Sequence, residues 1–129
     1  MAAGRRARRA EAPYLVRPVD RGLMGFAGLY ETYCDPTGGE IDTALIITTA
    51  ANALMSQLHG RMPAILERED FAAWLDVDGV DADEAVRLLR PAPDSKLELI
   101  EIGPAVNRAA YDDESLQRAV GEAIRAGVG

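Results

Sequence analysis

The chain has a single cysteine, Cys34, and a single histidine, His59, among its 129 residues. One cysteine excludes an intramolecular disulfide, and zinc sites built on several thiolates or on paired histidines lack their ligands. The sequence also contains no apolar run near the roughly 18 residues that a membrane-spanning helix needs, and no apolar segment typical of a secretory signal. We therefore expect a cytoplasmic protein without a metal or another cofactor.

Charge is unevenly distributed along the chain. The net charge is −7, from 14 basic and 21 acidic residues, yet the first ten residues carry four arginines and no acid. The rest of the chain therefore carries −11. An acidic body disfavours non-specific attraction to nucleic acid, so any contact with DNA has to be local. We expect residues 1–12 to form a disordered basic tail and residues 13–129 to form one domain.

The pattern of apolar residues predicts an α+β fold with a mostly antiparallel sheet and flanking helices. A turn rich in proline and glycine at residues 35–39 separates two strand-like runs, which is typical of a β-hairpin. Three strands precede the first expected helix, and this order excludes a doubly wound parallel sheet. We expect strands at 14–16, 23–33, 43–49 and 97–102, an extended segment at 62–66, and helices at 50–58, 67–75, 81–89 and from 113 or 115 to 125.

Three of these elements carry finer expectations. Residues 23–33 are apolar almost throughout, which favours burial on both faces, whereas 97–102 alternates apolar residues with glutamate, which favours one solvated face. Asp81 begins the helix at 81–89 and Glu84 follows three residues later, as in a capping box.

Several acidic and thiol side chains are candidates for chemistry. The acidic run 76–84 lacks the glycine and glutamate spacing of an EF-hand, so we interpret it as a solvated turn and helix cap. Cys34 has no basic neighbour in the sequence that would activate it, so we expect an ordinary, partly exposed thiol. Glu31 ends an apolar strand and is either a surface carboxylate or a site residue.

His59 is a stronger candidate, because it stands at an expected helix end and is followed by Gly60, Arg61 and Pro63. One interpretation is a histidine that caps the helix C-terminus. The other is an exposed pair, in which Pro63 turns the chain away and leaves His59 and Arg61 together as an anion-binding site.

A series of short sequence blocks resembles one known family. In order these are FAGLYE at 26–31, IITTAANALM at 46–55, HGRMPAIL at 59–66, WLD at 74–76, LLRP at 88–91, and VN at 106–107 with DDESL at 112–116. Together they resemble the C-terminal half of the SOS response-associated peptidase (SRAP) family, the abasic-site processing proteins. The resemblance covers about residues 11–124, and its HGRMP block is the most specific part.

The resemblance implies an unusual covalent chemistry. A cysteine exposed by removal of the initiator methionine attacks the aldehyde of an abasic site in single-stranded DNA through its α-amine, and its thiol closes a thiazolidine ring. The same cysteine gives the family its thiol autopeptidase activity. On matching positions, the resemblance implies that His59 is catalytic and that Arg61 and Asn107 contact DNA, with no metal.

The sequence departs from the family pattern at its start. It begins Met1-Ala2-Ala3 where the family has cysteine, and the family's Asn and Glu blocks do not precede Pro13. Glu31 matches a later block and is not the family's catalytic glutamate. We expect a truncated or split SRAP member that is inactive alone and has a separate N-terminal half as partner. The alternative is a non-catalytic module that binds single-stranded DNA or another protein.

Overall fold

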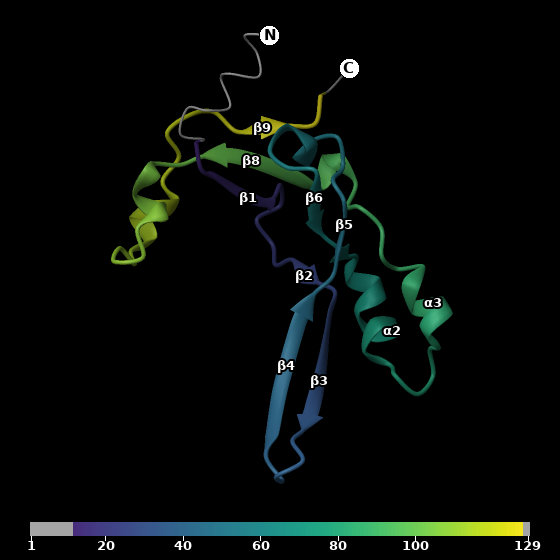
Figure 1. Ribbon diagram of the computed structural model, residues 1–129. Helices are drawn as coiled ribbons and strands as arrows, with labels where there is room; N and C mark the ends of the chain where they lie inside the picture. Colours follow the sequence, from purple (N-terminus) through teal and green to yellow (C-terminus); the bar gives the residue numbers. More distant parts are fainter. Residues whose placement is uncertain (1–11, 128–129) are drawn as a thin grey trace, which may run out of the picture.

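The computed structural model describes residues 12–127, which form four small antiparallel sheets connected by short helical turns (Figure 1). The α+β prediction with mostly antiparallel strands is confirmed. Of the predicted basic tail, all residues but Ala12 lie outside the described range. No helix between residues 12 and 127 is long and apolar enough to cross a membrane. The strands are β1 (Tyr14–Pro18), β2 (Gly25–Phe26), β3 (Gly28–Cys34), β4 (Glu40–Ile46), β5 (Thr48–Ala50), β6 (Arg61–Pro63), β7 (Ile65–Leu66), β8 (Leu97–Glu101) and β9 (Ile124–Arg125).

The largest sheet has the order β1-β8-β9 and lies at the top of Figure 1. Its central strand β8 packs against the main hydrophobic cluster, in which Leu97 and Leu99 join Leu54 and Met62. The predicted solvated face of β8 is wrong, because the side chain of Glu98 is fully buried. Arginines on the two neighbouring strands surround this carboxylate, so a charged residue occupies a buried position with its charge paired.

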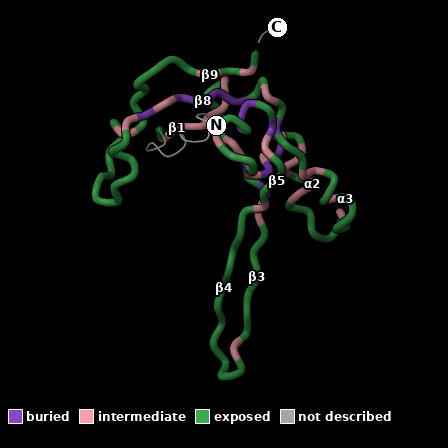
Figure 2. The backbone as a smooth tube through the Cα atoms, turned by 45° about the horizontal axis from the view of Figure 1, so that its top comes forward, coloured by how far each residue is buried: buried purple, intermediate pink, exposed green. Residues whose placement is uncertain are grey.

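The predicted hairpin is confirmed: β3 pairs with β4 in antiparallel register from Gly28↔Ile46 to Cys34↔Glu40. The predicted burial of this region on both faces is wrong. The hairpin projects from the body, and its residues beyond Gly28 are exposed along both strands (Figures 1 and 2). The reason is that β3 and β4 make their contacts chiefly with each other, although their apolar composition is that of covered strands.

Two predicted helices are absent. In place of a helix at 50–58 the chain continues as β5 and then forms only a short 3₁₀ turn, η1 (Met55–Gln57). In place of a helix ending at 125 the chain forms η5 (Glu114–Gln117) and then β9. In this second segment the Val120 N–H donates to the Glu101 carbonyl, so the chain pairs with β8 instead of bonding to itself.

The remaining helical predictions are confirmed in shortened form. η2 (Arg68–Asp70) leads into α2 (Phe71–Leu75), and α3 (Ala82–Val86) begins at Asp81, whose Oδ1 accepts the Glu84 N–H at 2.8 Å. The indole N–H of Trp74 donates to the Gly28 carbonyl at 3.2 Å. This bond attaches α2 to the base of the hairpin, beside a second small core of Ala27, Ala64 and Leu66.

Two further 3₁₀ segments complete the described residues. η3 (Asp94–Lys96) precedes β8, and η4 (Pro104–Asn107) follows it and leads into η5. η4 and η5 contact each other and lie to the left of the main body in Figure 1, away from β5 and β6.

Candidate functional site

His59 and Arg61 lie at one end of the two-stranded sheet formed by β5 and β6. The β-branched run Thr48-Thr49 favours an extended chain, and it pairs with β6 so that Ala50 lies opposite Arg61. The Ala51 N–H donates to the Gly60 carbonyl at 3.0 Å and closes the ladder just before the turn of the chain. Residues 51–60 therefore form a loop that begins and ends at this sheet and carries His59 near its second end.

Buried polar contacts hold this loop against the body. Asn52 is buried, its amide nitrogen donates to the Ala92 carbonyl at 2.8 Å, and its Oδ1 accepts the Met55 N–H at 2.8 Å. The Leu54 N–H donates to Asp94 Oδ1 at 3.0 Å. Ala92 and Asp94 lie 40 residues away in sequence from the loop residues that they bind. The start of the loop is therefore fixed by the tertiary structure and not only by its own turn.

The guanidinium of Arg61 is held in place by β5. Its Nη2 donates to both the carbonyl oxygen and the hydroxyl oxygen of Thr48, at 2.9 Å each. Arg61 is exposed, and it forms no ion pair with an acidic side chain among residues 12–127. A cation with free N–H donors is therefore presented to solvent from an ordered position, as anion binding requires.

The ring of His59 lies next to the backbone of the same arginine. The Arg61 N–H donates to His59 Nδ1 at 3.0 Å, while the His59 N–H donates to the Met55 carbonyl at 3.0 Å. His59 is exposed, and its second ring nitrogen, Nε2, has no hydrogen-bond partner among the described residues. Of the two sequence interpretations, the structure has the exposed pair: His59 follows a 3₁₀ turn of three residues and lies beside Arg61.

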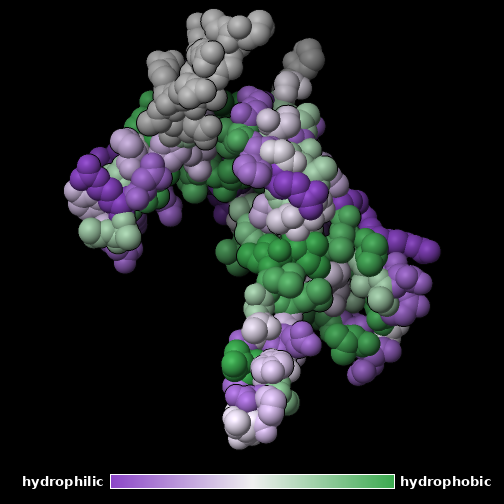
Figure 3. Space-filling model, viewed as in Figure 1, coloured by the Kyte–Doolittle hydropathy of each residue, from purple (hydrophilic) through white to green (hydrophobic). Residues whose placement is uncertain are grey.

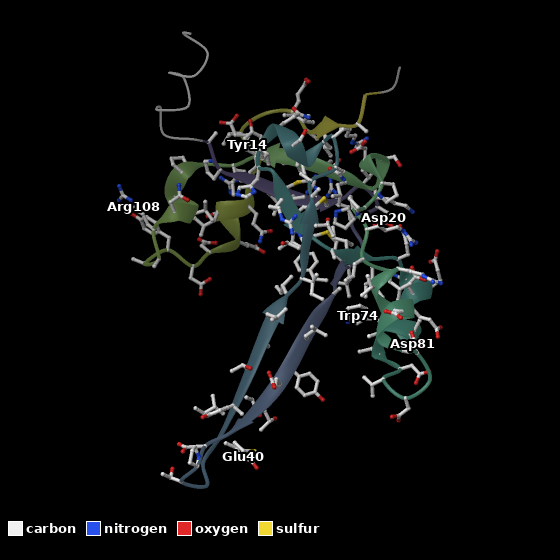
Figure 4. The ribbon with its side chains drawn as sticks, turned by 45° about the vertical axis from the view of Figure 1, so that its right-hand side comes forward. Tyr14, Asp20, Glu40, Trp74, Asp81 and Arg108 are labelled. Atoms are coloured by element: carbon white, nitrogen blue, oxygen red, sulfur yellow. The ribbon has the colours of Figure 1, made fainter. Side chains whose placement is uncertain are left out.

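The third sequence candidate, Asn107, lies elsewhere. It is the last residue of η4 and is exposed, and no described hydrogen bond joins it to His59 or Arg61. Its neighbour Arg108 has its guanidinium 6.0 Å from the ring centre of Tyr111. In Figure 4 Arg108 lies on the opposite side of the molecule from Trp74 and Asp81. The structure thus brings two of the three candidates together.

The other candidates are remote from the His59–Arg61 pair. Cys34 is exposed and pairs with Glu40, which lies at the far end of the hairpin in Figure 4. Glu31 is also an exposed hairpin residue. In the acidic run, Asp76 and Asp81 accept backbone N–H groups, as expected for a turn and a cap. Between residues 12 and 127 no group of three His, Cys, Asp or Glu side chains is placed to hold a metal ion.

Sequence reasoning missed two residues that shape the site, Thr48 and Asn52. No sequence pattern indicates the role of Thr48, because this role depends on pairing with a strand 13 residues away. A pattern does indicate Asn52: it is the only amide within the otherwise apolar segment 50–55, and a polar residue in such a run is usually buried with partners.

Comparison with known proteins identifies the family. A family model described as SOS response associated peptidase (SRAP) matches residues 4–109 of the chain. The chain belongs to the SRAP family. The match includes the loop with His59 and Arg61, the hairpin and Asn107.

Curated SRAP relatives carry the name abasic site processing protein. YoqW of Bacillus subtilis is 35% identical over 99 residues, which is 77% of this chain and 44% of YoqW. HMCES of Gallus gallus is 42% identical over 72 residues, which is 54% of this chain and 21% of HMCES. The chain thus spans less than half the length of these relatives.

A solved structure shares the fold of this chain. A protein of Bacteroides thetaiotaomicron superposes with a TM-score of 0.75 at 30% identity, over 88% of this chain and 50% of that chain. The fold of the described residues is therefore shared with about one half of a larger solved chain.

Proposed function

We propose that this SRAP chain takes part in the processing of abasic sites in single-stranded DNA, with His59 as a catalytic residue and Arg61 and Asn107 as DNA contacts. The observation that carries the proposal is the exposed His59–Arg61 pair, in which the guanidinium is held by Thr48 and has no acidic partner among the described residues. The names of the relatives supply the substrate.

Charge supports a local contact with DNA. Acidic residues dominate the chain outside its first ten residues, so a phosphate backbone is repelled by most of the surface. An arginine that has no acidic partner among the described residues and is held in an ordered backbone is then the feature that attracts the phosphate backbone. We therefore expect a DNA contact restricted to the His59–Arg61 pair and the segment of Asn107, and not a broad basic groove.

We also propose that a complementary SRAP segment covers the hairpin and supplies the family's N-terminal cysteine. One face of the hairpin presents two apolar pairs in register, Leu29↔Leu45 and Tyr33↔Ile41. These four side chains are between 54% and 56% exposed, and Tyr30 on the other face is 84% exposed. Exposed apolar pairs on one face and an exposed tyrosine on the other are typical of a surface that a partner covers.

The neighbouring surface is apolar as well. An open groove of about 720 Å³ runs between β3 and the helices α2 and α3, lined by Leu29, Tyr30, Trp74, Leu75 and Val77 among others. In Figure 3 hydrophobic side chains gather where the hairpin leaves the body and along α2. The half of the Bacteroides chain that this protein does not match is a segment of sufficient size to fill such a surface.

In this proposal the chain alone forms no covalent link to DNA. The link requires an amine and a thiol on one carbon framework, which is a property of an N-terminal cysteine. Cys34 carries its thiol within a strand, where its nitrogen is part of a peptide bond. The complementary segment therefore supplies the nucleophile, and this chain supplies His59 and Arg61.

DNA binding tests the proposal directly. Fluorescence anisotropy with a labelled single strand that contains a tetrahydrofuran abasic analogue compares the wild type with Arg61→Ala and Asn107→Ala. The matched control is Arg87→Ala, which removes an equal charge from the exposed end of α3. We expect Arg61→Ala to weaken binding and to reduce the slope of log K against log salt by about 0.7. Equal affinities for Arg61→Ala and Arg87→Ala would exclude Arg61 as the DNA contact.

A further inference from the structure

The contact between the Arg61 N–H and His59 Nδ1 fixes where the histidine carries its proton. A backbone amide can only donate, so Nδ1 at 3.0 Å must offer its lone pair. In the neutral ring the single proton then resides on Nε2. The backbone amide of Arg61 thus sets the tautomer of the neutral ring.

The strand register explains why this N–H is available. The Ala51 N–H donates to the Gly60 carbonyl, and the Ala64 N–H donates to the Ile47 carbonyl, so hydrogen-bonded pairs alternate along β5 and β6. The pair Ala50↔Arg61 lies between bonded pairs. In an antiparallel ladder the amides of such a pair point away from the partner strand. The Arg61 N–H is therefore free to bind the ring without loss of a ladder bond.

We propose that the backbone N–H of Arg61 is a positioning group that keeps neutral His59 in its Nε2–H tautomer, so that the ring presents a hydrogen-bond donor to the DNA. This inference rests on the proposed function for its ligand, but the tautomer itself does not. The Arg61 guanidinium, held by Thr48, supplies further donors from the same residue. The Nε2–H of the ring and the remaining guanidinium N–H groups then favour a ligand oxygen with free lone pairs.

The arrangement separates two roles that a histidine can have. A general base needs a lone pair at the nitrogen that faces the substrate, and that nitrogen in His59 is Nε2, which carries the proton. To act as a base there, the ring would have to give up the bond from Arg61. As a fixed donor it instead stabilises an oxygen, with no reorganisation when the ligand arrives. The oxygen belongs to a phosphodiester or to the abasic sugar.

The first experiment measures the hydrogen bond without DNA. In uniformly ¹⁵N-labelled chain at pH 8.5, a nitrogen–nitrogen coupling across the hydrogen bond should connect the Arg61 amide with His59 Nδ1. The ring signals are unambiguous, because the chain has one histidine. Long-range proton–nitrogen spectra should show Nε2 as the protonated nitrogen. A folded wild type that lacks the coupling, or that is protonated at Nδ1, overturns the proposal.

Two variants separate the backbone of Arg61 from its side chain. Arg61→Ala keeps the N–H and should retain the coupling and the tautomer. Arg61→Pro removes the N–H together with the side chain, and the second tautomer should then appear in the ring spectrum. If Arg61→Pro keeps the wild-type ring spectrum, the N–H does not set the tautomer. Because the wild-type coupling is measured independently, a proline variant that fails to fold leaves the test intact.

The second experiment identifies the oxygen. Inorganic phosphate, 2-deoxyribose and the tetrahydrofuran oligonucleotide are added separately, and the Nε2 signal is followed. A shift with phosphate and the oligonucleotide supports a donor to a phosphodiester, and a shift with deoxyribose supports a donor to the sugar. No shift with any of the three, while the coupling to Arg61 persists, overturns the donor role. Loss of DNA binding with an intact coupling contradicts the proposed function and not the tautomer.

Discussion

Glu98→Gln is the change that most directly tests how the largest sheet is held together. Glu98 lies directly opposite Arg17 on β1 and Arg125 on β9, so one carboxylate connects all three strands. It accepts from Arg17 Nε at 2.6 Å and from Arg125 Nε at 2.7 Å, and Arg21 Nε lies 3.9 Å away. The hydrogen bonds from Arg17 and Arg125 lower the pKa of Glu98 and outweigh the effect of burial, which raises it.

The expected loss of stability in Glu98→Gln follows from the number of hydrogen bonds to the carboxylate and from the exposure of the arginines. A hydrogen bond to a charged group contributes about 1.5–3 kcal/mol, against about 1 kcal/mol for a neutral one. Glutamine keeps one acceptor oxygen and turns an NH₂ donor toward the other arginine, so one of the two bonds is lost and the arginines have no counter-charge. The side chain of Arg125 is 59% exposed and that of Arg17 is 27% exposed, so water compensates in part. We expect Glu98→Gln to lower the free energy of unfolding by about 2–3 kcal/mol.

Urea unfolding at pH 7, followed by circular dichroism, measures this loss. The matched control is Glu101→Gln on the same strand, which has no ion pair among the described residues and should cost less than about 0.5 kcal/mol. Because the pKa of Glu98 is lowered in the folded state, its contribution is present above the ordinary value of 4.5 and is lost as the pH falls through the folded pKa. Equal stability of the two variants at pH 7, or a difference that stays constant down to pH 2, would refute this reasoning.

Two further predictions concern the loop and the hairpin. Asn52→Ala removes two buried hydrogen bonds and should lower the free energy of unfolding by about 2–3 kcal/mol, whereas Asn107→Ala, at an exposed position, should change it by less than about 0.5 kcal/mol in the same urea experiment. The exposed hairpin should make the chain self-associate, and the double substitution of Leu29 and Leu45 by lysine should shift its sedimentation toward the monomer. A wild type that sediments as a sharp monomer at all concentrations would contradict the second prediction.

The features of the fold that were correctly predicted from the sequence depend on residues close together in the chain. The turn at 35–39 and the Asp81 cap act within a few positions, and both are found in the structure. The helices expected at 50–58 and toward 125 failed because residues with helical spacing can also bond to distant parts of the chain. Here Asn52 and Leu54 bond to Ala92 and Asp94, and the last segment pairs with β8. Hydrogen bonds between residues far apart in the sequence compete with helix propensity, and a local sequence pattern does not reveal them.

The candidate site could be predicted from the sequence only in part, for the same reason. His59 and Arg61 are two residues apart, so their proximity could be expected from the sequence. The groups that orient them could not, because Thr48 reaches Arg61 and Asn52 reaches Ala92 through tertiary pairing. The burial of Glu98 was missed for a related reason: an alternating strand predicts a solvated face, and only the register shows that two arginines lie opposite the carboxylate.

The most direct test of the central claim is a denaturing gel after incubation with single-stranded DNA that carries a natural abasic site. We predict no heat-stable adduct with this chain alone. When a complementary SRAP segment that begins with cysteine is added, we predict an adduct on that segment. His59→Ala in this chain should then slow its formation about 10²- to 10³-fold, as expected for loss of a donor that stabilises an oxygen. A stable adduct on the 13.9 kDa chain by itself, or an unchanged rate with His59→Ala, would contradict the account.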